Sequence, residues 1–551
     1  MKNQLIFRYI LPFSLGIGVF AYIIAKAIFV QITTDEAYTL TILTKETVWN
    51  LVSYADSYTN NHILNSLLCK LSFNLFGMNQ LAGRLPNILS FILYFWFAWQ
   101  YSRRFFKSEL VGFMCLAVLL GNPYMIEFFS LARGYGMSLA FMMSSMYYAA
   151  AYVLEGEKRS LPISLAFSIL AVYAQFALLH FYLALNFLIL LFSIQEYYKT
   201  RETAQLLRGG LTQIIGAAIL GLLVYAPFKA ILRDNQISYY GSKNIWDDSI
   251  VSVISRSIYG QGYFGDDTVI VFKNLMVALF IIAVSNLIQK IYNTKENKIK
   301  KNKERIEQNK KQIDLNSALL DQIEGDNRGL MVENNELLIK NNDLLIANNN
   351  LLLTPDLSIK PEKDPSVFAL TLMASTFFVI TFQFYVFGTQ YVIERTSIFL
   401  FPIIALNFPT VATYFGDKLS RVGSFVASIF IIFCIWHMVR AGNLSHFSEW
   451  WFDKNTKDVL EIMKTEYQKM QVKRPLRLNT HCSMQPSFDY YYQEQHLNWL
   501  VEPFGWNSKV DTIKEYDFYY DLNDEWDALK SRYDTLKSYD KGEYLLLKRK
   551  Q

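Results

Sequence analysis

The feature that most constrains this chain is a series of apolar runs, each about twenty residues long. A hydrocarbon core of about 30 Å requires about 20 apolar helical residues per crossing, and a soluble core does not need runs of this length in such number. Hydrophobic residues make up 52% of the 551 residues, and charged residues only 18%. The sequence therefore predicts a polytopic membrane protein that is mainly α-helical.

Eleven crossings are predicted in total, and two of them share one apolar stretch. The crossings are expected near residues 9–30, 80–100, 109–128, 135–154, 161–179, 181–195, 210–228, 269–289, 366–387, 396–414 and 422–440. The break between the fifth and sixth is expected near Leu178, His180 and Tyr182. If these two were a single crossing, every later segment would face the opposite side.

Charges in the short loops predict the orientation, because Lys and Arg there are retained on the cytoplasmic side. With the amino terminus inside, the short inner segments hold 12 Lys and Arg in 46 residues, and the outer segments hold 8 in 106. We therefore expect a cytoplasmic amino terminus and an extracytoplasmic carboxyl tail. The first apolar run, about 22 residues, exceeds a signal-peptide core and is expected to be an uncleaved anchor.

Composition excludes several other classes. Four cysteines without CxxC spacing give no zinc or iron–sulfur signature and no disulfide scaffold. A net charge of +5, spread over many loops, argues against nucleic acid as a partner.

A polar insert at residues 292–365 interrupts the apolar pattern. It begins with a cluster of lysines, after which aliphatic residues recur every seven positions at Ile299, Ile306, Ile313 and Leu320. After a break at residues 325–329, an Asn-Asn-acidic-Leu-Leu-Ile pattern begins at Asn334, and closely related patterns follow at Asn341 and Asn348. Two coiled-coil-like helices joined by a Gly-containing turn fit this best, and the lysines place them on the cytoplasmic side. A low-complexity spacer, a hairpin that self-associates through residues 296–353 and a membrane-surface patch remain alternatives.

The tail from residue 441 to residue 551 follows a different pattern. Segments 475–479, 516–520 and 543–547 are typical of strands, and 524–533 is typical of a helix. A small outer α/β domain is expected. The predicted organisation is therefore a membrane domain in two parts, 1–291 with an outer catalytic loop at 31–78, and 366–440, with the insert between them and the tail domain after them.

Ionisable residues gather at the predicted outer membrane face, where placing them is costly unless they are used. They come from distant segments: Asp35 and Glu36, His62 and Arg84, Glu127 and Arg133, His180, Arg233 and Arg256, and Glu394 and Arg395. Each has a simpler explanation. The two acids could cap a helix starting near Ala37, the arginines could reach lipid headgroups, and the histidines could be interface residues.

Taken in order, several short motifs resemble a known family. They are Thr33-Thr34-Asp35-Glu36-Ala37-Tyr38, Asn61-His62-Ile63-Leu64, Leu75-Phe76-Gly77, Ala82-Gly83-Arg84-Leu85-Pro86, Ala132-Arg133-Gly134-Tyr135 and Glu394-Arg395-Thr396. The series resembles the GT-C glycosyltransferases, in particular the bacterial branch related to protein O-mannosyltransferases and the lipid A aminoarabinose transferase. The likeness covers about residues 1–230 and 366–440. The His62 segment lacks the prolines that often follow it in relatives, and the insert has no counterpart.

The resemblance implies an enzyme of the cell envelope, in the inner (plasma) membrane. It would transfer a hexose or pentose from a polyprenyl-phosphate carrier to a glycan, lipid or protein acceptor on the outer face, with inversion. Asp35 is then the expected base, with Glu36 beside it, because an ionised carboxylate can accept the proton of the acceptor hydroxyl. The expected phosphate-binding residues are Arg84, Arg133, Arg395 and, more weakly, Arg256, because guanidinium binds phosphate oxygens bidentately. His62, Tyr135 and His180 are expected to contact substrate.

Two other functions compete with this interpretation. A transporter or lipid flippase would use the same charges to line a passage, and would show broken helices in two matching halves. An assembly protein without catalysis would use the insert to bind partners. No cofactor beyond the lipid-linked donor is required, although Asp35 and Glu36 are compatible with a divalent metal. The position of Asp35 discriminates, because the transferase fails if this carboxylate faces lipid.

Overall fold

The computed structural model of the chain describes most of the sequence. The described residues are 5–56, 59–201, 203–234, 236, 239–258, 268–320, 328–353, 364–412, 420–471, 474–501, 516–522 and 526–550.

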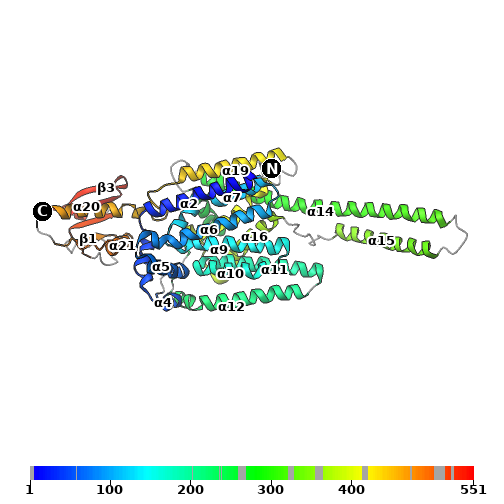
Figure 1. Cartoon of the computed structure of the whole chain (residues 1–551), viewed down its shortest axis with the longest axis horizontal. Helices are drawn as coiled ribbons and strands as arrows, with labels where there is room; N and C mark the ends of the chain where they lie inside the picture. Colours follow the sequence, from blue (N-terminus) through cyan, green and yellow to red (C-terminus); the bar gives the residue numbers. More distant parts are fainter. Residues whose placement is uncertain are drawn as a thin grey trace.

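A bundle of helices forms the centre of the molecule, with a small C-terminal domain at one end and a two-helix arm at the other (Figure 1). We call these the domain end and the arm end. The helices of the membrane part and of the arm are α2 (Leu11–Phe29), α3 (Thr34–Thr41), α4 (Val48–Ser53), α5 (Ile63–Phe76), α6 (Gln80–Phe105), α7 (Glu109–Leu120), α8 (Pro123–Glu127), α9 (Gly134–Glu155), α10 (Ser160–Ala174), α11 (Leu179–Thr200), α12 (Thr203–Arg233), α13 (Val251–Ser257), α14 (Thr268–Leu320), α15 (Arg328–Leu353), α16 (Pro365–Phe387), α17 (Leu400–Ala405) and α19 (Ser420–Ala441).

Among the described residues, eight helices are long and apolar enough to cross a membrane. A ninth span forms if α7 and the segment Pro123–Ser130, bent from it by 60°, are counted as one. The other two predicted crossings are the shorter apolar helices Ser160–Ala174 and Leu400–Ala412. Each predicted run is thus an apolar helix, but only eight or nine of the eleven have the length of a full crossing. The chain is a multi-pass membrane protein.

The break between the fifth and sixth predicted runs lies slightly earlier than expected. Helix α10 ends at Ala174, and α11 begins at Leu179 after a short turn at Phe176–Leu178. The two runs are therefore separate helices.

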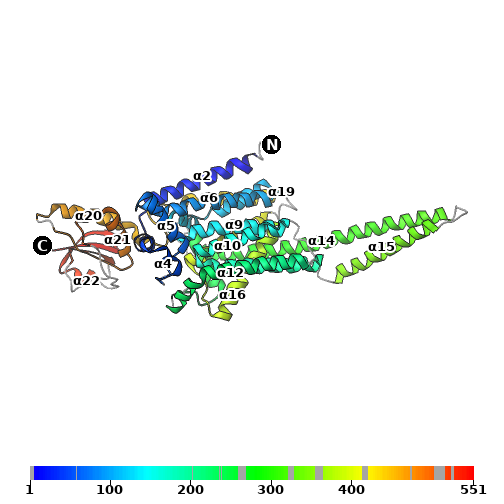
Figure 2. The same ribbon diagram turned by 60° about the horizontal axis from the view of Figure 1, so that its bottom comes forward.

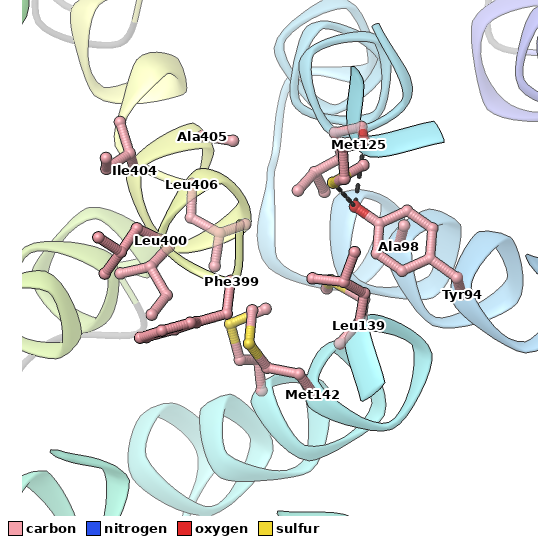
Figure 3. Packing of buried hydrophobic residues seen from close by; sticks show 14 of the residues in the cluster. Tyr94, Ala98, Met125, Leu139, Met142, Phe399, Leu400, Ile404, Ala405 and Leu406 are labelled. Atoms are coloured by element: carbon pink, nitrogen blue, oxygen red, sulfur yellow. Dashed lines mark hydrogen bonds between the residues drawn. The ribbon is translucent and has the colours of Figure 1, made fainter. Parts of the chain in front are cut away.

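Helix α9 lies at the centre of the bundle, and 78% of its most apolar stretch is buried inside the protein. Small residues on this helix, among them Ala140, Ser144 and Ala151, are fully buried and let α6 and α10 approach closely. In the packed core between α6, α8, α9 and α17, Tyr94 donates a hydrogen bond to the Leu119 carbonyl, and Met142 lies against Phe399 (Figure 3).

The C-terminal domain contains a four-stranded sheet in the order β1-β2-β4-β3. Its strands are β1 (Leu478–Thr480), β2 (Phe518–Leu522), β3 (Tyr533–Tyr539) and β4 (Tyr544–Arg549), and its helices are α20 (Thr456–Lys469), α21 (Gln485–Gln495) and α22 (Trp526–Leu529). Strand β1 is parallel to β2, and the other pairs are antiparallel. The α/β prediction is confirmed. The edge strand β3 was not predicted, because its five central side chains are exposed and give no apolar alternation.

The C-terminal domain holds the first turn of α3 through hydrogen bonds. The Tyr491 hydroxyl accepts a hydrogen bond from the Ile32 N–H (2.9 Å), and the buried Asp453 carboxyl accepts one from the Thr34 N–H (2.7 Å). The second Asp453 oxygen accepts from the Ser487 hydroxyl (2.8 Å). The tail domain is therefore attached directly to the helix that carries Asp35.

We expect Asp453→Ala to destabilise this attachment by about 1–3 kcal/mol, because the Thr34 N–H and the Ser487 hydroxyl lose their acceptor. Thermal unfolding in detergent measures the effect. Asp458→Ala is the matched control, since Asp458 bonds Lys537 and Tyr539 of β3 rather than α3. Equal melting temperatures for the two variants would contradict the prediction.

Candidate active site at the domain end

Asp35 lies between two guanidinium groups. It is the second residue of α3, and one of its carboxylate oxygens, Oδ2, is 3.5 Å from a terminal nitrogen of Arg133 and 3.5 Å from one of Arg395. Its side chain is only 13% exposed, and Oδ2 has no hydrogen-bond partner. The carboxylate does not face lipid. It is held among cations at the start of a helix, where a negative charge is favoured.

The two arginines are held by different elements. Arg133 precedes α9 and donates hydrogen bonds to the carbonyl (3.1 Å) and the side chain of Asn60, while Asn60 donates to the Asp35 carbonyl (3.1 Å). Arg395 belongs to the short turn Glu394–Ser397 and lies over the Trp450 ring. Burial opposes the charge of Arg395, but Tyr135 and Asp35 outweigh it and raise the pKa of its guanidinium. The Arg395 guanidinium is therefore positively charged.

The two predicted histidines border the same region. The His62 ring contacts Tyr135 at 5.0 Å between centroids, and the His180 ring lies 5.7 Å from Tyr239. Burial, with the cations Arg133 and Arg395, holds the pKa of His62 well below its ordinary value, so its imidazole is neutral at pH 7. The Nε2 atoms of both histidines lack hydrogen-bond partners.

Unpaired buried polar atoms concentrate in this region. Buried polar atoms in folded proteins nearly always have partners, so each exception needs an explanation. Five of the exceptions in the described residues are Asp35 Oδ2, Tyr54 Oη, His62 Nε2, Arg133 Nε and His180 Nε2. Tyr54 interacts electrostatically with Arg133 and Tyr239, which links these atoms into one region. Such a set fits a site whose polar groups await a ligand.

Gly134 permits this arrangement. A Cβ atom there would lie 2.0 Å from the Ala174 carbonyl oxygen and 2.8 Å from the His62 Cβ. Only glycine lets the start of α9 approach both the end of α10 and His62.

Glu36 and Arg84 lie next to this region but have a different role. Arg84 is fully buried, and its five N–H groups donate to both Glu36 oxygens and to the carbonyls of Ala27, Val30 and Gln31. Glu36 also accepts from the N–H groups of Thr33 and Ala132. No donor of Arg84 is left for a phosphate, and no oxygen of Glu36 faces the site. Both were predicted to contact substrate, and in the structure their hydrogen bonds join α2, α3 and α6.

A second charged cluster adjoins Arg395. Arg256 pairs with Glu394, and its Nε lies 3.5 Å from a Glu449 oxygen. Burial raises the pKa of Glu449, while Arg256 and its hydrogen bond from Tyr124 lower it in part. Glu394 has a φ of 49°, an uncommon left-handed conformation for a residue with a side chain. Arg256 is thus brought beside the Arg395 segment, as the sequence predicted.

An apolar groove leads away from this second cluster. It has a volume of about 490 Å³ and is lined by α13, α14, α19 and the segment after α17, with Phe272, Leu279, Phe408 and Phe433 among its residues. Its polar end is Ser257, the residue after Arg256, where Asn122 and His437 hydrogen-bond the Ser257 hydroxyl and carbonyl. The groove therefore runs between apolar helices and ends at Ser257, the residue next to Arg256.

Several site residues were not predicted from sequence. They include Asn60, Tyr54, Tyr239 and Glu449. These residues lie in loops or at helix ends, and no sequence pattern marks them as site residues. The sequence also did not predict the buried pair of Lys26 and Glu127, 3.2 Å apart, because Lys26 lies within an apolar run. A divalent metal site is not formed by the described residues, which contain no group of three His, Cys, Asp or Glu positioned to hold an ion.

No protein-family model and no curated protein matches the chain. Two solved structures are similar: ArnT from Cupriavidus metallidurans bound to undecaprenyl phosphate, with a TM-score of 0.44, and the same protein in the apo state, with 0.37. In both comparisons the identity is 10%, and the match covers 98% of this chain and 97% of ArnT. ArnT is a lipid A aminoarabinose transferase, of the class that the sequence motifs resemble. At this identity and TM-score the likeness assigns no function.

For the buried pair, we expect Arg84→Met to lower the free energy of unfolding by about 3–5 kcal/mol, because Glu36 is left buried without its cation. The double variant Glu36→Gln with Arg84→Met should recover part of this loss, since it removes the unpaired charge. Thermal unfolding of the purified variants checks both. A single variant as stable as the wild type would contradict the structural role.

Proposed function

We propose that the chain is a membrane glycosyltransferase that uses a polyprenyl-phosphate sugar as donor and an acceptor hydroxyl on the outer face. The observation that carries this proposal is the position of the Asp35 carboxylate. Its Oδ2 atom makes no hydrogen bond and lies 3.5 Å from a terminal nitrogen of each of Arg133 and Arg395. A base and two phosphate-binding cations then occupy one buried site.

The proposed step is a single displacement with inversion. The acceptor oxygen attacks the anomeric carbon, and its proton passes to the Asp35 carboxylate. The bond from the anomeric carbon to the phosphate oxygen breaks, and its electron pair stays on the lipid phosphate. Arg133 and Arg395 would stabilise the charge that develops on that phosphate, in a region with little water.

The apolar groove supports a lipid-linked donor. Its lining is almost entirely apolar, and its polar end adjoins Arg256, close to the Arg395 segment. A polyprenyl chain in the groove would place its phosphate near these guanidiniums. This arrangement requires no nucleotide-binding loop, because the membrane itself holds the donor.

Neutral His62 and Tyr135 suit contact with sugar or acceptor. One ring nitrogen of His62 hydrogen-bonds the Ala174 backbone. In a neutral imidazole the other nitrogen, Nε2, is then an acceptor, which suits a sugar hydroxyl. His180 contacts Tyr239, which in turn interacts with Tyr135, so His180 would contact another part of the substrate. Mass analysis of lipid-linked sugars and surface glycans from cells with and without the protein would identify the sugar, the carrier and the acceptor.

Asp35→Asn should reduce transfer by about 100 to 10,000-fold, because a general base is lost while size and shape are kept. The readout is the glycan mass change that the wild-type protein produces in cells, normalised to the amount of protein in the membrane. Asp247→Asn is the control, since that carboxylate is half-exposed and paired with Lys273. Normal transfer by Asp35→Asn would remove this residue from the proposed role.

Arg133→Lys and Arg395→Lys should each weaken binding of undecaprenyl phosphate by about 10 to 150-fold. Lysine keeps the charge but loses the planar fork, and a hydrogen bond to a charged group is worth about 1.5–3 kcal/mol. Equilibrium binding to the purified protein measures the change. Arg233→Lys is the matched control, because Arg233 is exposed and pairs with its neighbour Asp234. Equal affinity in all three variants would exclude a phosphate site here.

A further inference from the structure

The arm pairs its two helices through asparagines. Between α14 and α15, Asn302 bonds Asn348 (2.9 Å), Asn309 bonds Asn341 (2.8 Å) and Asn316 bonds Asn334 (3.1 Å). On each helix these residues recur every seven positions, in opposite directions along the chain. An asparagine in each heptad therefore sets the register of this antiparallel contact.

Helix α15 carries a second face with the same chemistry, and none of the residues that the structure describes covers it. Exposed aliphatic residues recur there every seven positions: Met331 and Val332, Leu338 and Ile339, Leu345 and Ile346, each about half or more exposed. The exposed Asn335 and Asn342 lie within the same stripe. At 100° per residue, this stripe is centred about 120° around the helix from the α14 contact. We call it the outer stripe of α15.

The membrane does not cover the outer stripe. Helix α14 runs without a break from the spanning segment Thr268–Ser285 to Leu320, so it extends about 80 Å at 1.5 Å per residue. The arm therefore continues along the bundle axis and points away from the other spanning helices (Figures 1 and 2). Six large apolar side chains on a helix outside the membrane indicate a protein surface as their partner.

We propose that the outer stripe of α15 binds the same stripe of a second copy of this chain, as a parallel and in-register pair. Two copies in one membrane have the same orientation, so their arms point in the same direction. The two-fold axis then lies along the membrane normal, and each residue meets its own counterpart at the same height. Asn342 faces the partner's Asn342, and Ile339 packs beside the partner's Ile339.

The composition of the stripe favours this occupant. A symmetric parallel contact brings identical side chains together, so any charge in it would face a like charge. The stripe is aliphatic with asparagine and carries no charged residue, whereas the outward positions Lys310 and Lys311 of α14 would repel their counterparts. A buried asparagine in a parallel pair also specifies register and two strands. This inference is independent of the proposed transferase activity, which concerns the opposite end of the molecule.

Disulfide cross-linking in native membranes tests the geometry. In a Cys482→Ser background the remaining cysteines are buried, and Asn342→Cys should form a covalent dimer with its counterpart. Lys310→Cys, on the exposed outer side of α14, is the control and should not. Failure of Asn342→Cys to cross-link, or equal cross-linking of both variants, would overturn the parallel in-register pair.

Mass measurement in nanodiscs assembled with excess lipid tests the stoichiometry. The wild type should be a dimer, and the double variant Ile339→Lys with Ile346→Lys should be a monomer, because four lysines would meet at the contact. Asn309→Cys with Asn341→Cys, placed in that variant, should still form its intramolecular disulfide and show that the arm remains paired. A monomeric or trimeric wild type, or a lysine variant that stays dimeric, would exclude the proposal.

Discussion

The buried ion pair of Glu36 and Arg84 is the contact on which the rest of the site depends. Arg84 donates to three carbonyls at the end of the first crossing, and Glu36 accepts from Thr33 and Ala132, so one pair joins four segments. Removing two charges from water is expensive unless every donor and acceptor is satisfied, which is the case here. The consequence is a fixed position for the next residue, Asp35.

The contrast between the neighbours Asp35 and Glu36 follows from their places on one short helix. Successive helical residues point about 100° apart, so Glu36 points into the protein and Asp35 toward Arg133 and Arg395. One carboxylate has its hydrogen bonds satisfied and holds the fold. The other has one oxygen that makes no hydrogen bond and lies between two cations.

The two ends of the molecule are specialised in different ways. The domain end combines buried charges, unpaired polar atoms and a tail domain that holds α3 through Asp453 and Tyr491. The arm end carries only helices, and its heptads match a helix-to-helix contact. A continuous α14 connects the arm to the membrane domain. Association of two arms would therefore align two bundles without altering the candidate active site of either copy.

The sequence by itself determined the membrane class, the positions of the eleven predicted apolar helices, the two helices of the insert and an α/β tail, because hydrophobic length and periodicity are local properties. Its motifs also predicted Asp35, Arg133 and Arg395 as site residues, and the structure brings these three side chains together. It could not separate Asp35 from Glu36, or Arg84 from Arg133 and Arg395, since all five are charged residues at or near helix starts. Only the tertiary structure decided which arginine donates its hydrogen bonds to backbone carbonyls and which arginines lie beside Asp35. The difference depends on contacts between segments up to 360 residues apart.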